Sequence, residues 1–130
     1  MIGRCCTLLF LLVGLAAATP AWPGQAVTAR YEEISGTRVT LVVEIGDPPP
    51  AMIIIEQEIP AGLTLLDASP PFNKMSGARS SAKWLLKDAG PGRQRILMQF
   101  SGPVDARDLR SELRFRVRGT ESSEMITVTP

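Results

Sequence analysis

Two serines and a lysine are the residues whose types and spacing come closest to a catalytic dyad. Ser80 and Ser81 lie just before Lys83. A lysine activates a serine hydroxyl only when burial lowers the pKa of its amine enough to make it neutral. The alternation of this segment places Lys83 on the outward face of a strand, without the burial that such a dyad needs. We therefore predict a turn that leads into a strand, and no catalysis.

Other chemistry finds even less support in the sequence. The chain contains no histidine, which removes the commonest general base and every Ser-His or Cys-His arrangement. Glu44, Glu56 and Glu58 share an outward orientation, but Ca²⁺ needs about six to eight oxygen ligands and the spacing of a calcium loop is absent. We expect no enzyme activity, no cofactor and no metal site.

The strongest charge feature is a set of arginines near the C-terminus. Arg114, Arg116 and Arg118 alternate with apolar residues, and Arg110 lies just upstream. The alternation predicts a strand whose apolar side faces the core and whose guanidinium groups face water. Phe115 is the one aromatic residue in this run and should point inward. Without a stacking platform, nucleic acid is not an expected partner.

Charge is divided unequally along the chain. Residues 27–73 contain two basic and seven acidic residues, whereas residues 74–118 contain eleven basic and four acidic residues. The two halves can pair across a sheet, each pair contributing a few tenths of a kcal/mol. Alternatively, the arginines form an anion-binding face for lipopolysaccharide, a phosphate-bearing glycan or an acidic partner.

Three apolar residues have outward positions on strands that are neighbours in the sequence. They are Met52, Ile54 and Val42. Exposed apolar residues with a charged rim are typical of interaction surfaces, and the arginines would supply that rim. Segment 27–31 could equally cover this patch.

The elements that position these residues are short strands separated by Gly and Pro. We expect strands at 27–32, 38–45, 51–59, 63–68, 82–86, 94–100, 112–118 and 125–129. One helical turn capped by Asp105 and carrying Leu109 is expected between strands 94–100 and 112–118. About eight short strands with such turns favour a single antiparallel β-sandwich. The residues expected on its inner faces are Val39, Leu41, Val43, Ile53, Ile55, Ile59, Trp84, Ile96, Met98, Phe100, Leu113, Phe115 and Val117.

One block of the sequence is more specific than alternation alone. It runs from Ile53 to Leu63 through Pro60-Ala61-Gly62, continues with Trp84, and then passes Gly90-Pro91-Gly92 before a closing strand. This pattern resembles the bacterial Ig-like repeat domains of the DUF11 type, which occur in cell-surface proteins. The resemblance covers roughly residues 39–117, which is most of the mature chain, and it implies an Ig-like sandwich there. Because these motifs are structural in that family, the resemblance implies little about function.

The N-terminus has the pattern of a secretory signal peptide. Arg4 precedes an apolar stretch from Cys5 to Leu15, and small residues follow. Cleavage after Ala18, Ala21 or Ala26 satisfies the small-residue rule. We therefore expect residues 1–26 to form a signal-peptide helix, with cleavage somewhere after residues 18–26, and residues 27–130 to form the sandwich domain. Contact with the membrane would be limited to this transient segment.

Export has two consequences for the mature domain. Both cysteines and Arg4 leave with the signal peptide, so the remaining 13 basic and 13 acidic residues balance and no disulfide is available. We predict a small exported, non-catalytic Ig-like protein of the bacterial cell envelope, either periplasmic or extracellular. It would bind an envelope protein or a surface glycan. The alternative is a structural subunit that assembles head to tail, its acidic half against a basic half.

Overall fold

The computed structural model describes residues 26–116 and 122–130. Most of the expected signal peptide, together with Val117 and Arg118, therefore lies outside the described residues. The described part forms strands β1 (Val27–Ser35), β2 (Arg38–Ile45), β3 (Met52–Glu58), β4 (Leu65–Ser69), β5 (Lys74–Met75), β6 (Ser81–Lys87), β7 (Gly92–Phe100), β8 (Ser111–Arg116) and β9 (Ser123–Val128).

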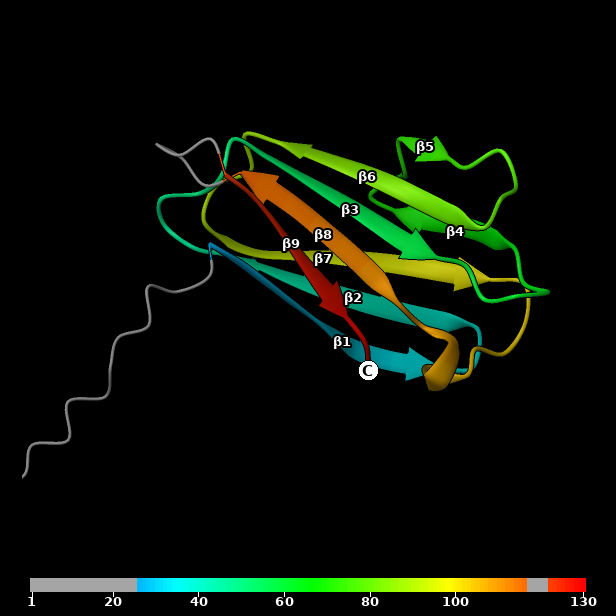
Figure 1. Cartoon of the computed structure of the whole chain (residues 1–130). Helices are drawn as coiled ribbons and strands as arrows, with labels where there is room; N and C mark the ends of the chain where they lie inside the picture. Colours follow the sequence, from blue (N-terminus) through cyan, green and yellow to red (C-terminus); the bar gives the residue numbers. More distant parts are fainter. Residues whose placement is uncertain (1–25, 117–121) are drawn as a thin grey trace, which may run out of the picture.

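These strands form two antiparallel sheets that pack face to face (Figure 1). The first sheet has the order β1-β2-β7-β4, and the second has the order β5-β6-β3-β8-β9. The predicted all-β antiparallel sandwich is therefore confirmed, and each expected strand is present. The additional strand, β5, has only two residues, too few to show any alternation in the sequence.

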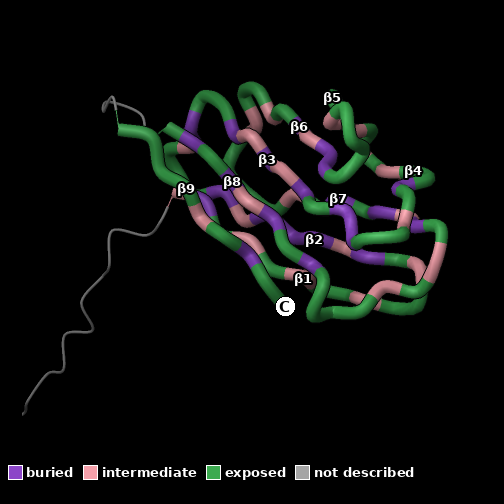
Figure 2. Tube along the Cα trace, turned by 45° about the vertical axis from the view of Figure 1, so that its right-hand side comes forward, coloured by how far each residue is buried: buried purple, intermediate pink, exposed green. Residues whose placement is uncertain are grey.

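The core fills the space between the sheets, and the buried positions alternate with exposed ones along the strands (Figure 2). Every described residue that was expected on an inner face is buried. The core also includes Val27, Ile45, Leu65, Ala82, Leu109 and Val128. Alternation over short strands thus identified the interior correctly.

Trp84 is the largest of the fully buried side chains, with 1% of its surface exposed. Its indole Nε1 donates a hydrogen bond of 2.8 Å to the carbonyl oxygen of Pro70, in the segment that follows β4. The ring of Phe72 packs edge-on against it, with centroids 6.3 Å apart. The predicted inner-face position of Trp84 is confirmed, and its N–H finds a partner at the edge of the core. Trp84 therefore ties a strand of the second sheet to the segment leaving the first.

A polar link also crosses the interior. Gln57 on β3 is fully buried, and its Nε2 donates to the carbonyl oxygens of Glu58 and Arg110 at 3.0 and 3.1 Å. The hydroxyl of Tyr31, on β1 of the other sheet, lies 3.0 Å from Gln57 Oε1 and 3.1 Å from Ser111 Oγ. Burial raises the pKa of Tyr31 above its usual value. The hydrogen bonds offset the cost of placing these polar groups in the interior.

Two connections follow the local chemistry of the sequence. Pro60 ends the extended segment that follows β3, and the N–H of Leu63 donates to the carbonyl oxygen of Pro60 at 3.1 Å. Gly62 occupies the third position of this turn with φ of +81°, a conformation that glycine adopts without a Cβ clash. Before β8, Asp105 caps the short 3₁₀ turn Ala106–Asp108, and Leu109 after it is buried. Both predicted features are confirmed.

Candidate interaction surface

The outer face of the second sheet brings together most of the predicted site residues. Strand register aligns Leu85, Ile54, Arg114 and Met125 in one row across β6, β3, β8 and β9. We call these four residues the central row. All of its members except Arg114 are apolar, so this sheet presents apolar side chains to solvent as well as to the core.

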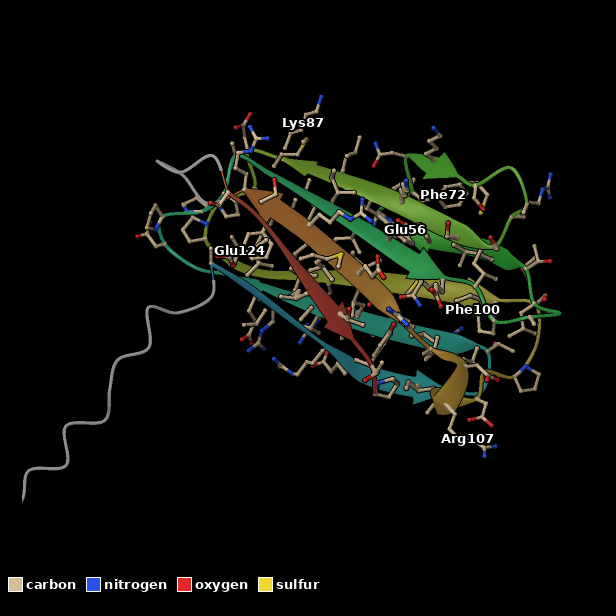
Figure 3. All side chains as sticks on the ribbon, in the orientation of Figure 1. Glu56, Phe72, Lys87, Phe100, Arg107 and Glu124 are labelled. Atoms are coloured by element: carbon tan, nitrogen blue, oxygen red, sulfur yellow. The ribbon has the colours of Figure 1, made fainter. Side chains whose placement is uncertain are left out.

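Two further rows flank the central row. On one side, Met52 pairs with Lys87 and Arg116 pairs with Ser123. These four residues form the basic row. On the other side, Glu56 pairs with both Lys83 and Glu112, and Glu112 pairs with Thr127. These four form the acidic row, which carries both of the carboxylates in the three rows. Figure 3 shows Lys87 near one end of the sandwich and Glu56 further along the sheet.

A hollow of about 420 Å³ opens where the central and basic rows meet the ends of the strands. It is lined by Ala51, Met52, Ile54, Arg114, Phe115, Arg116, Ser123, Glu124 and Met125. Four predicted site residues therefore share one concavity. Met125 was missed as a site residue, although it is 58% exposed. Its outward position in a predicted strand was the available signal.

The remaining arginines of the predicted set lie elsewhere. Arg110 is outside the hollow and pairs with Glu112 at 3.3 Å, and Arg114 approaches the same carboxylate at 3.7 Å. Arg118 lies outside the described residues. Arg116 makes no ion pair within 4.0 Å among the residues that the structure describes. Among the described arginines of the predicted set, Arg116 therefore has the greatest capacity to bind an external anion.

The prediction that Val42 joins Met52 and Ile54 is wrong. β2 and β3 follow one another in the sequence but belong to different sheets, so Val42 lies on the opposite outer face of the sandwich. It is also fully buried. Strand register places it between Arg30 and Arg95, whose aliphatic stems can cover it while their charged ends reach water.

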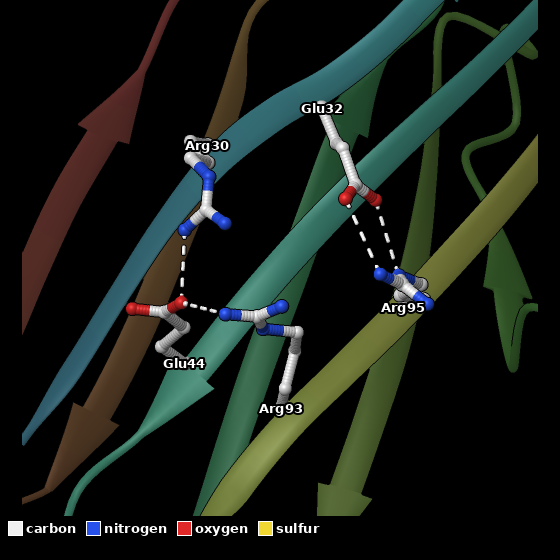
Figure 4. A network of polar contacts seen from close by, with 5 residues as sticks. All are labelled: Arg30, Glu32, Glu44, Arg93 and Arg95. Atoms are coloured by element: carbon white, nitrogen blue, oxygen red, sulfur yellow. Dashed lines mark hydrogen bonds and ion pairs between the residues drawn. The ribbon is translucent and has the colours of Figure 1, made fainter.

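The outer face of the first sheet is dominated by ion pairs (Figure 4). Glu44 Oε1 lies 2.9 Å from Arg30 Nη1 and 3.1 Å from Arg93 Nη2. Arg95 binds both carboxylate oxygens of Glu32, at 3.1 and 3.2 Å. The hydrogen bond from Arg30 is the largest cause that lowers the pKa of Glu44. On this sheet, the acidic half of the chain does pair with the basic half, through Arg93 and Arg95, which are outside the predicted set of arginines.

The acidic residues that shared an outward orientation are not one cluster. Glu44 faces out from the first sheet, whereas Glu56 and Glu58 belong to β3 of the second sheet. The possibility that these three carboxylates approach one another is therefore excluded. Within residues 26–116 and 122–130, no group of three or more acidic or cysteine side chains is placed to hold a metal ion.

The Ser-Lys segment forms the predicted turn into a strand. Ser76 Oγ accepts hydrogen bonds from the backbone N–H groups of Ser80 and Ser81 at 3.0 and 3.1 Å. Lys83 follows on β6 with its side chain 42% exposed, and its Nζ lies 3.9 Å from a Glu56 oxygen. A half-exposed amine beside a carboxylate lacks the burial that a Ser-Lys dyad requires.

The fold and this surface define the class of the protein as a two-sheet β-sandwich with one apolar, basic-edged outer face. In comparisons with known proteins, the chain matches no family model and no curated protein. Within the described ranges, no helix has the length and apolar character needed to cross a membrane.

Proposed function

We propose that the chain is an exported, non-catalytic Ig-like interaction module of the bacterial cell envelope. The outer face of its second sheet binds a protein partner. The observation that carries this proposal is the hollow, where Met52, Ile54 and Met125 lie beside Arg114 and Arg116. Exposed apolar side chains with a polar rim are typical of interaction surfaces.

The distribution of aromatic residues favours a protein partner over a surface glycan. Sugar rings usually stack on exposed aromatic side chains, and proteins bind them through such platforms. Among the described residues, Trp84, Phe100 and Phe115 are buried, while Tyr31 and Phe72 are partly buried and packed against the core. The apolar groups of the candidate surface are instead flexible methionines and aliphatic side chains, which adapt to protein surfaces.

The proposed location depends on the N-terminal sequence. The positive residue, the apolar stretch and the small residues before the domain are the pattern of an export signal. The resemblance to repeat domains of cell-surface proteins supports the same location. Mass spectrometry of the exported form should show a chain that begins between residues 19 and 27.

Head-to-tail assembly driven by charge is the less favoured alternative. It requires free carboxylates in the N-terminal half and free cations in the C-terminal half. The structure uses several of these groups internally, in the pairs Glu32–Arg95, Glu44–Arg93 and Glu56–Lys83. Fewer charges then remain for contacts between copies.

Position-specific cross-linking in living cells tests the proposed binding face. A photoactivatable amino acid replaces Met52, which is 41% exposed on the second sheet, and in a matched control it replaces Leu97, which is 52% exposed on the first. Each full-length variant is expressed in the organism that naturally encodes the protein. We expect a discrete protein adduct from position 52 and none from position 97. No adduct from position 52, or the same adduct from both, would refute the proposed face.

A further inference from the structure

The last strand of the second sheet, β9, has one side with which no described strand pairs. The register shows which residues face that side. The N–H of Glu58 donates to the carbonyl oxygen of Arg110 at 2.9 Å, so the even-numbered residues of β8 bond to β3 and the odd-numbered residues bond to β9. The even-numbered residues of β9 then bond to β8. The backbone N–H and C=O groups of Ser123, Met125 and Thr127 therefore point away from the sheet.

The other three edges of the two sheets are interrupted or covered. Both edge strands of the first sheet, β1 and β4, contain a bulge. β5 has only two residues, and where it ends the side-chain oxygen of Asn73 accepts a hydrogen bond of 2.8 Å from the N–H of Leu85 on β6. Bulges and very short edge strands hinder pairing with another chain. β9 has neither device, because its six residues pair with β8 in unbroken register.

We propose that β9 accepts an extended segment of the protein partner as an additional antiparallel strand. The inference rests on the proposed function, because it states how the partner of that binding face is held. A row of backbone N–H and C=O groups along an extended edge is matched by a second extended backbone, which supplies an acceptor for each donor and a donor for each acceptor. The unpaired edge therefore selects the conformation of its occupant.

The surroundings of β9 supply apolar contacts for such a segment. Met125 is exposed on the outer face, and the hollow lies beside it. On the inner face, Ile126 is only partly buried against the core. β1 of the first sheet approaches the C-terminal end of β9 (Figure 1), yet Thr127 is exposed there. A flexible segment can pair with this edge and then turn over the hollow, whereas a folded second copy would bring only its own edge strand.

The side chains of β9 predict the sequence of the segment. In antiparallel pairing, successive residues of the segment lie opposite Thr127, Ile126, Met125, Glu124 and Ser123 in that order. Apolar residues suit the positions opposite Ile126 and Met125, and threonine suits both ends. A basic residue suits the position opposite Glu124, which forms no ion pair within 4.0 Å among the residues that the structure describes. The segment predicted from these contacts is Thr-Val-Leu-Lys-Thr.

Nuclear magnetic resonance of the ¹⁵N-labelled protein, in the form that its cells accumulate, tests the added strand. The probe is the capped peptide Thr-Thr-Val-Leu-Lys-Thr-Thr at up to about 2 mM, the range of weak complexes. Without peptide, the amide of Met125 should exchange with solvent faster than that of Ile126, which bonds to β8. The peptide should shift the amide signals of β9 and slow the exchange of Met125.

Two methylated peptides of identical composition test the hydrogen bonds themselves. The N–H of the peptide leucine, opposite Met125, faces β9, whereas the N–H of the peptide lysine faces away from it. A methyl group on the leucine nitrogen should weaken binding at least about tenfold, because it removes a bond to the edge and places bulk there. The same group on the lysine nitrogen should leave the dissociation constant within about twofold of the original.

A charge exchange tests the register. Glu124→Lys should weaken binding several-fold, because like charges then lie opposite each other, and replacing the peptide lysine by glutamate should restore it. Asp67→Lys makes the same change of charge on β4, at the opposite side of the sandwich, and should have no effect.

Several results would overturn the added strand. They are a Met125 amide already protected in the free protein, no binding up to about 2 mM, equal effects of the two methyl groups, or no rescue of Glu124→Lys. Shifts of the β9 signals with protein concentration alone would assign the edge to a second copy. The cross-link from position 52 separates these failures from that of the proposed function. If it captures a discrete protein while the peptide fails, the binding face stands and the added strand falls. If it captures none, the proposed function falls and this inference falls with it.

Discussion

Replacing Tyr31 by Phe tests whether the polar link between the sheets stabilises the fold. The substitution keeps the ring in place and removes the hydroxyl that lies 3.0 Å from Gln57 Oε1. Because Gln57 is fully buried, water cannot readily replace the lost partner. A buried acceptor left without a partner costs about 1–3 kcal/mol. We expect a loss of about 2 kcal/mol in the free energy of unfolding.

Urea denaturation followed by circular dichroism and by Trp84 fluorescence measures this loss. For a domain of this size, about 2 kcal/mol corresponds to a decrease in Tm of roughly 8–16 °C. Ser111→Ala is the matched control. It also removes a hydroxyl near Tyr31 but leaves the Tyr31–Gln57 hydrogen bond, so it should cost only about 0.5–1 kcal/mol. A Tyr31→Phe variant within about 0.5 kcal/mol of the original protein would refute the argument.

The same variant should change how stability depends on pH. Burial raises the pKa of Tyr31 in the folded state, so the folded protein holds this proton more tightly than the unfolded chain. The resulting stabilisation is fully present below the unfolded pKa of about 10 and is lost as the pH rises through the folded pKa. We expect the difference in stability between the original protein and Tyr31→Phe to shrink above about pH 10. A difference that stays constant to high pH would contradict this.

Two further substitutions test the core and the turn after β3. Trp84→Ala should lower the free energy of unfolding by about 3–5 kcal/mol because it leaves a cavity in the core, as measured by urea denaturation followed by circular dichroism. Leu85→Ala, next to it on the exposed face, should lower it far less. Equal losses would mean that Trp84 does not fill the core. Gly62→Ala should lower the Tm by at least several degrees because alanine is strained at φ of +81°, while Gly77→Ala, at a glycine without positive φ and with open space around it, should not.

Alternation along the chain was sufficient to predict the strands and the interior. Each strand buries one face against the opposite sheet, so a period of two appears in the sequence wherever a strand is long enough to show it. The turn at Gly62 and the cap at Asp105 were predictable because each depends on a few adjacent residues. The two residues of β5 show no period and were missed.

The arrangement of strands within the sheets was not predictable in the same way. Val42 and Ile54 both have outward positions, yet β2 and β3 belong to different sheets, and nothing local records the crossing between them. The error over Glu44 and Glu56 has the same cause. The group at Met52, Ile54 and Arg116 was expected correctly because β3 and β8 happen to be neighbours.

The pairing of distant strands has a consequence for the order in which the molecule can be completed. The central partners Leu41 and Ile96 of the first sheet, and Ile55 and Leu113 of the second, come from opposite halves of the chain. Neither sheet can form completely until its strand from the C-terminal half, β7 or β8, has been synthesised. The growing chain therefore has incomplete sheets for most of its synthesis. Such non-local closure makes folding slow. Such a polypeptide stays largely unfolded while it is being synthesised, and it becomes rigid only near the end of its synthesis.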